Sequence, residues 1–193
     1  MKLLRVCSAA FLFALVLVPA AAHAAVTLVL QLDGIQGEST IPGYENQIVL
    51  SSVSFSVEQA VALKEAGKGG LTAAKAAFTP ITIEKGADKA SPQLFLSNLL
   101  GKPIKRAKLS FLAPNDGPSS TPVEFFSISL ANIFISKFGV AASLGDDNTQ
   151  EQVTLNYGML LLTYTPALGT PITKGFDLIK NKEISDLPPI ITN

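Results

Sequence analysis

Apolar and polar residues alternate with a period of two along much of the chain, and this pattern restricts the possible folds more than any other feature. In residues 49–57, valines and one phenylalanine fall on one face and serines fall on the other. Residues 105–112 and 153–161 show a similar alternation. Because successive side chains of a β-strand point to opposite faces, each of these segments is predicted to be a half-buried strand and not a helix.

The remaining segments indicate more strands and one helix. Strands are expected in residues 26–32, 78–84 and 123–138, and the helix in about residues 91–101. Ser91 before a proline is typical of a helix N-cap, and Gly101 stands where a C-terminal cap is expected. Since no strand–helix–strand alternation is present, the chain is predicted to be mostly β, as a barrel or a sandwich.

The first 24 residues have the three parts of a secretory signal peptide. Lys2 and Arg5 supply positive charge, residues 6–18 are almost entirely apolar, and residues 22–24 (Ala-His-Ala) form a cleavage motif. The apolar run is too short to span a bilayer as a helix. We therefore expect residues 1–24 to be removed by cleavage after Ala24. The remaining chain is then expected to be periplasmic or secreted, without insertion into a membrane.

Removal of this leader also removes the only cysteine, Cys7, and the only histidine, His23. Serine–histidine–aspartate triads, cysteine nucleophiles and metal or haem sites with histidine or cysteine ligands are thereby excluded. We therefore expect a protein that is not an enzyme and needs no cofactor. One alternative stays open, because two carboxylates suffice for glycosidase-type acid–base chemistry. The candidate carboxylates are Glu38, Glu45, Asp33 and Asp88.

Charged and glycine-rich segments give weaker indications. The basic residues are dispersed and the whole chain has no net charge, which argues against nucleic acid as a partner. Residues 67–77 are predicted to be a flexible loop, since their glycines lack the spacing of a phosphate-binding loop. Asp146 and Asp147 are expected in a solvated turn. Arg106 and Lys108 share one strand face, where they could meet an acidic partner or protect an edge strand.

Three segments, in the expected strand order, carry a more specific pattern. Residues 32–40 read LDGIQGEST, and residues 78–95 read FTPITIEKGADKASPQLF. Residues 151–157 read EQVTLNY and lead into a strand that ends at residues 164–166. Together these segments resemble the Hcp family, the haemolysin-coregulated tube proteins of type VI secretion, over residues 27–166.

The resemblance implies a compact two-sheet antiparallel β-barrel with one flanking α-helix. It also implies hexameric rings that stack into a hollow tube inside a contractile sheath, with small effector proteins in the lumen. The chain departs from the family in its leader and in Tyr44, where the family often carries a histidine. It also departs in residues 167–193, which extend past the Hcp-like domain of residues 25–166 and are expected to be partly disordered.

Two functional hypotheses follow from the leader and the resemblance. The first is an exported structural protein that assembles with its own copies into rings or tubes. Its further partners would be other type VI secretion components or small effector proteins. The alternative is a periplasmic or secreted monomeric binding module that retains the Hcp fold without assembling.

Polar and glycine residues of two loops are candidates for the contact between neighbouring subunits: Asp33, Gly34, Glu38 and Ser39 in the first loop, and Lys85, Asp88, Lys89 and Ser91 before the helix. Each residue also has a local explanation, because glycine permits a tight turn and serine can cap a helix. For the two loops as a pair, we favour the subunit interface.

Charge reversal at Asp88 tests this interpretation. If the loop meets a neighbouring subunit, Asp88→Lys should weaken assembly while the monomer stays folded, since like charges repel across an interface. Light scattering on a sizing column measures the assembly mass. A mass equal to that of the parent chain would contradict the interface role of Asp88.

Overall fold

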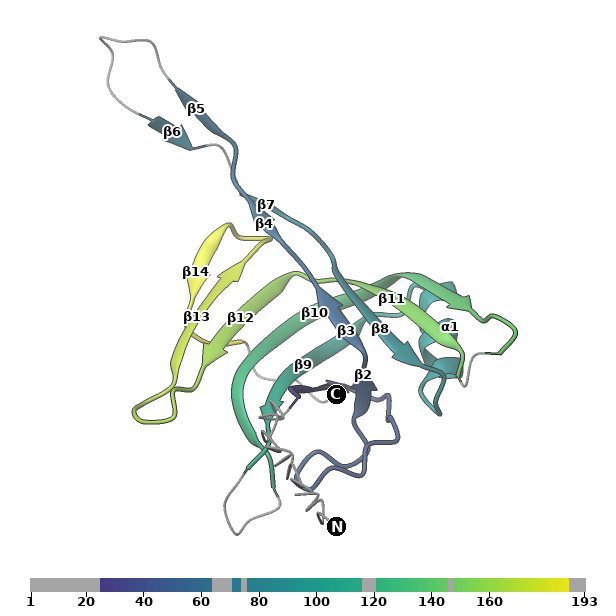
Figure 1. The fold of residues 1–193 in the computed structure, drawn as a ribbon. Helices are drawn as coiled ribbons and strands as arrows, with labels where there is room; N and C mark the ends of the chain where they lie inside the picture. The colour runs from purple at the N-terminus through teal and green to yellow at the C-terminus, as the bar shows by residue number, and fades with distance from the viewer. Residues whose placement is uncertain (1–24, 64–70, 74–75, 116–120, 146–147, 188–193) are drawn as a thin grey trace, which may run out of the picture.

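The computed structural model describes residues 25–63, 71–73, 76–115, 121–145 and 148–187. In this part of the chain, antiparallel strands dominate and one helix flanks them (Figure 1). No helix among the described residues is long and apolar enough to span a membrane.

The first sheet runs in the order β2–β1–β9–β10–β12–β13–β14, with every pair antiparallel. Its strands are β1 (Thr27–Leu32), β2 (Ile48–Leu50), β9 (Ile104–Ala113), β10 (Val123–Ala141), β12 (Met159–Tyr164), β13 (Ile172–Asp177) and β14 (Lys182–Ile184).

The second sheet starts from the C-terminal half of β10 and continues through β11 (Gln150–Asn156) and β8 (Ile81–Gly86) to β3 (Ser52–Ser54). β10 is 19 residues long, and its register shifts between Ile135 and Lys137. An irregularity of this kind bends a strand and increases its twist, so β10 passes from one sheet into the other.

The predicted fold class, mostly β with antiparallel sheets and one helix, is confirmed. The sheets do not form a closed barrel, however, because the hydrogen-bonded paths through the described strands end at β2, β14 and β3. Only Ser51 separates β2 of the first sheet from β3 of the second, so the chain crosses between the sheets there without a ladder that joins them.

The hydrophobic core is filled by the residues that the alternation places on the inner face of each strand. Leu30, Leu109 and Ile128 of the first sheet are at most 1% exposed, and Ile83 and Val153 of the second sheet are fully buried. Burial of one such side chain contributes about 1.5–3 kcal/mol. The core therefore depends on both sheets together.

The helix α1 (Ser91–Leu99) lies where the sequence predicts it, and Gly101 ends it as expected. Gly101 adopts a φ of 57°, its N–H donates to the Asn98 carbonyl, and the Lys102 N–H donates to the Ser97 carbonyl. These two bonds form a Schellman motif. The prediction for the start of the helix is wrong. Ala90 is the N-cap residue and Ser91 is the first helical residue, and the Ser91 hydroxyl donates to Glu151 instead of capping the helix.

Four short strands form a two-stranded ribbon that projects from the body of the protein (Figure 1). β4 (Val57–Glu58) pairs with β7 (Ala77–Phe78), and β5 (Val61–Leu63) pairs with β6 (Leu71–Ala73). We call residues 57–78 the arm. β6 and β7 occupy part of residues 67–77, so the prediction of a loop is wrong at those positions. Pairing with β5 and β4 satisfies the backbone N–H and C=O groups of these strands, and the local composition does not reveal such partners. Residues 67–70 and 74–75 lie outside the described residues, as do Asp146 and Asp147.

The described part of the C-terminal segment is ordered and continues the first sheet beyond residue 166. β13 and β14 add two strands next to β12. Phe176 of β13 stacks on Phe78 of the arm, with ring centroids 5.6 Å apart. Leu187, which is 7% exposed, packs in a small cluster with Met159 and Leu161. The tail therefore supports both the sheet and the base of the arm.

Candidate functional site

The two loops singled out from the sequence meet through Glu38 and Lys89. The Glu38 carboxylate accepts a hydrogen bond from the Lys89 backbone N–H at 3.1 Å. The Lys89 ammonium donates to the Asn46 side chain at 3.2 Å. Both Glu38 and Lys89 are exposed, so this junction lies at the surface of the chain.

Ser39 is buried beneath this junction. It is 6% exposed, its backbone N–H donates to the Gln47 carbonyl, and its carbonyl accepts from the Asn46 N–H, both at 2.9 Å. Gly37 next to it has no room for a Cβ atom, which would overlap the Gln47 carbonyl. The loop is therefore closed tightly on itself, and the glycine is required by this close approach of the backbone.

The second loop surrounds the ammonium group of Lys85, which is fully buried. Its Nζ lies 2.7 Å from Glu151 Oε2 and 2.8 Å from Asp88 Oδ1. It also donates to the Gly86 carbonyl at 2.6 Å and to the Ser91 hydroxyl at 3.0 Å. The Ser91 hydroxyl in turn donates to Glu151 at 2.7 Å. We call Lys85, Asp88, Ser91 and Glu151 the lysine cluster.

The lysine cluster joins a sheet to a helix. Lys85 and Glu151 are cross-strand partners on β8 and β11, while Asp88 and Ser91 belong to the loop before α1 and to its first residue. A buried charge is costly unless it is paired and hydrogen-bonded. Four oxygen atoms around Lys85 meet that requirement, so the start of the helix is held against the second sheet.

Asp33 and Gly34 lie elsewhere, at the end of β1. Gly34 has a φ of 78°, which a tight turn there requires, and the Asp33 N–H donates to the Arg106 carbonyl at 3.1 Å. The structure therefore brings six of the eight candidate residues to one region and leaves this pair apart. The six are Glu38, Ser39, Lys85, Asp88, Lys89 and Ser91.

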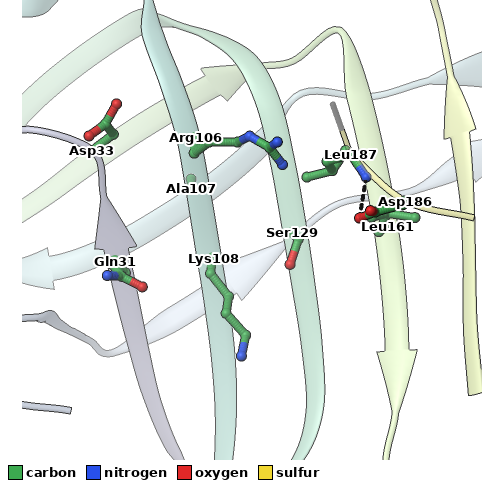
Figure 2. Close-up of a pocket in the computed structure, with 9 residues that line it drawn as sticks. All are labelled: Gln31, Asp33, Arg106, Ala107, Lys108, Ser129, Leu161, Asp186 and Leu187. Atoms are coloured by element: carbon green, nitrogen blue, oxygen red, sulfur yellow. Dashed lines mark hydrogen bonds between the residues drawn. The ribbon is translucent and has the colours of Figure 1, made fainter. Parts of the chain in front are cut away.

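Asp33 instead lines a cavity of about 360 Å³ on the side of the first sheet that faces away from the core. Figure 2 shows the Arg106 side chain reaching from β9 toward β10 within this cavity, with Asp33 on its other side. Lys108, on the same strand, pairs with Glu124 at 2.9 Å. β9 lies between β1 and β10, so the idea that these cations protect an edge strand is wrong.

Three of the four carboxylates considered for acid–base chemistry, Glu38, Glu45 and Asp88, make hydrogen bonds or ion pairs within the described chain. Glu38 and Asp88 bond as given above. The Glu45 carboxylate accepts hydrogen bonds from its own backbone N–H and from that of Gly43, and these bonds lower its pKa. At the neighbouring position, burial and the Glu124 carboxylate raise the pKa of the Tyr44 hydroxyl. Among the described residues, no group of histidine, cysteine, aspartate or glutamate side chains is arranged to hold a metal ion.

The sequence reasoning missed Glu151, although the strand pattern contains the necessary signal. Glu151 has the same parity as Val153 and Leu155, which face the core, and Lys85 has the same parity as Ile81 and Ile83. When two residues of opposite charge each lie on the core-facing side of their strand, a buried ion pair is indicated. Only the β8–β11 register shows that they meet.

Known proteins match this fold over most of its length. The family model described as type VI secretion system effector, Hcp, matches residues 29–164. Hcp1 from Salmonella typhimurium is 28% identical, covers 83% of this chain and 99% of its own, and superposes with a TM-score of 0.69. A further type six secretion system protein, 23% identical, shares the fold with a TM-score of 0.74 over 83% of this chain and 100% of its own.

A sequence relative agrees with the structural matches. Protein hcp1 from Pseudomonas aeruginosa is 27% identical over 107 residues, which are 52% of this chain. The match spans 64% of the length of that protein.

The two antiparallel sheets, the single flanking helix and the family match define a protein of the type VI secretion class. The chain belongs to the Hcp family of secreted type VI secretion proteins.

The lysine cluster changes what we expect of Asp88. Its carboxylate lies 2.8 Å from the fully buried Lys85, so charge reversal there would place two cations together inside the monomer. Such a change is expected to destabilise the monomer as well as any assembly. A test of the interface therefore needs residues outside the cluster.

Glu151→Gln tests the role of the cluster in stability. The substitution keeps the shape of the side chain but removes one of two carboxylates that neutralise a buried ammonium, so we expect a loss of about 3 kcal/mol in the free energy of unfolding. Urea denaturation of residues 25–193 measures it. The matched control is Glu183→Gln, whose partner Lys174 lies at a similar 2.8 Å but on the surface; it should leave stability unchanged. Equal effects of the two variants would contradict the assigned role of Glu151.

Proposed function

We propose that this chain is an exported structural protein of type VI secretion that assembles with copies of itself into six-membered rings, which stack into a tube able to hold small effector proteins. The observation that carries the proposal is the family match over residues 29–164, which includes the second sheet, the arm, the helix and the first sheet without β13 and β14. Assembly and cargo are the parts of the proposal that experiment has to test.

The arm supports self-association. Among the described strands, β4 and β7 pair only with each other, as do β5 and β6, and an isolated two-stranded ribbon is marginally stable in water. Val57, on the described part of the arm, is 49% exposed. A surface on a neighbouring subunit would stabilise the ribbon and shield its apolar residues.

The outer face of the second sheet suits a polar cargo or the lining of a lumen. Ser54, Thr82 and Thr154 lie beside a cavity of about 420 Å³ on this face. Hydroxyl groups offer both donors and acceptors without a fixed charge. Such a surface can contact different proteins without binding any of them tightly.

The exposed members of the two loops are the ones we assign to the subunit contact, namely Asp33, Glu38 and Lys89. Gly34 shapes the first turn. The buried and partly buried candidates act from within the monomer, because they hold the backbone of both loops in place. These residues are Ser39, Lys85, Asp88 and Ser91. Their contribution to assembly is therefore indirect.

Export through the leader can be tested by the N-terminal residue. Cleavage after Ala24 leaves every described strand intact, since β1 begins at Thr27. N-terminal sequencing of the protein recovered from the periplasm or the medium should therefore start at Ala25. Recovery of the protein with Met1 at its start would contradict the leader.

The solution mass of residues 25–193 tests the assembly. Light scattering on a sizing column should report a mass close to six subunits, because the arm and the loops need partners that the monomer does not supply. A monomer at high concentration would overturn the ring. The protein would then be the monomeric binding module with an Hcp fold.

A further inference from the structure

The cavity on the outer face of the first sheet has a row of paired residues as its floor. Lys108 of β9 stands opposite Gln31 of β1 on one side and Ser129 of β10 on the other. Ser129 in turn stands opposite Leu161 of β12. Directly paired residues of an antiparallel sheet lie on the same face, and Arg106 shares that face because it precedes Lys108 by two residues. The cavity therefore extends across four neighbouring strands.

The C-terminal segment forms one side of this cavity. Leu187 is 7% and Leu161 6% exposed, and both belong to one small apolar cluster. Asp186 is exposed, and its carboxylate accepts a hydrogen bond from the Leu187 N–H at 2.7 Å. The volume of about 360 Å³ falls within the range of about 300–1,000 Å³ that is typical of pockets for small molecules. The cavity thus combines an apolar wall with polar groups.

The Arg106 guanidinium is the cation that remains available in this cavity. In the part of the chain that the structure describes, it forms no ion pair or hydrogen bond, and the side chain is half-buried. Figure 2 shows it directed toward the side of Asp186 and away from Asp33. The other cation of the lining, Lys108, is paired with Glu124 at 2.9 Å. A guanidinium in this position can bind a carboxylate through two parallel hydrogen bonds.

The acidic residues of the lining restrict the kind of anion that fits. Asp33 and Asp186 both line the cavity, so a doubly charged anion such as inorganic phosphate would be repelled. A ligand with one carboxylate and one ammonium group avoids this repulsion, because its ammonium group can pair with an aspartate. A free amino acid has both groups on one carbon atom, whereas a peptide carries them at opposite ends.

We propose that this cavity binds a free α-amino acid with an apolar side chain of about the size of leucine. Arg106 binds the carboxylate of the ligand and Asp186 binds its ammonium group. The apolar side chain packs against Leu161 and Leu187, which removes apolar surface from water. The whole site lies within one chain, so the proposal does not rest on the proposed ring.

Binding of L-leucine to residues 25–193 tests the proposal. Equilibrium dialysis with radiolabelled L-leucine should give saturable binding of one molecule per chain. Unlabelled leucinamide lacks the carboxylate and 4-methylpentanoate lacks the ammonium group. Each should compete at least about tenfold more weakly than unlabelled L-leucine, because each loses hydrogen bonds between charged groups. Inorganic phosphate should not compete.

Two variants assign the charged groups of the ligand. Arg106→Gln should raise the dissociation constant of L-leucine at least about tenfold, since it removes the partner of the carboxylate. Asp186→Asn keeps an oxygen that can accept from the Leu187 N–H and should weaken L-leucine by a similar factor without weakening 4-methylpentanoate. The matched control Lys182→Gln removes an exposed cation of β14 and should leave binding unchanged. Circular dichroism checks that each variant is folded.

The outcomes separate this site from the proposed ring. Saturable binding of L-leucine that depends on both Arg106 and Asp186 supports the site. Lack of saturable binding to the parent chain, full binding by Arg106→Gln, or an equal loss in Lys182→Gln would overturn it. Competition by phosphate or 4-methylpentanoate as strong as that by L-leucine would also overturn it, because the cavity would then be a site for anions only. A parent chain that binds L-leucine but is monomeric at every concentration would overturn the ring and leave this site standing.

Discussion

The buried ammonium of Lys85 is the interaction on which the arrangement of the other elements depends. It joins β8 to β11 through Glu151 and fixes the loop before α1 through Asp88 and Ser91. A charge buried in this way permits few alternatives, because movement of the helix start would remove two of its four partners, Asp88 and Ser91, in a medium of low polarity. The helix is thus positioned by polar contacts at its N-terminus more than by an apolar face. This explains how Leu96 and Leu99 can remain outside.

The molecule consequently places charge inside and apolar surface outside at the same end of the second sheet. A monomer that functioned alone would gain from the reverse arrangement, since burial of each leucine is favourable. The exposed α1 residues and the arm are consistent with a subunit whose stability is completed by neighbours. The lysine cluster holds the loop before α1 against the second sheet. The C-terminal strands add support at the other side, where Phe176 stacks on Phe78 at the base of the arm.

Predictions from the sequence succeeded where local chemistry dominates. Residues 105–112 form β9 as their period of two predicts, and the position of α1 and its end at Gly101 follow from side-chain periodicity and from the backbone freedom of glycine. The predicted strands of residues 49–57 and 153–161 are each divided, the first among β2, β3 and β4 and the second between β11 and β12. They failed where a contact between distant segments decides the outcome. Ser91 has the residue type and position of an N-cap, yet its hydroxyl bonds to Glu151, 60 residues away in the chain. The glycine-rich segment before Phe78 is a poor strand by composition, yet β6 forms there because β5 pairs with it.

The sequence by itself determined the class of fold, the candidate loops and the family resemblance, because alternation and short motifs are properties of neighbouring residues. Tertiary structure alone decided which candidate residues act together. It buried Lys85 against Glu151 and left Asp33 at a separate cavity. It also showed that Leu96 and Leu99 of α1, which at helical spacing suggest a core, face solvent, whereas Leu94 is buried. The physical reason is that periodicity tells which residues share a face, whereas only the packing of the whole chain determines what that face meets.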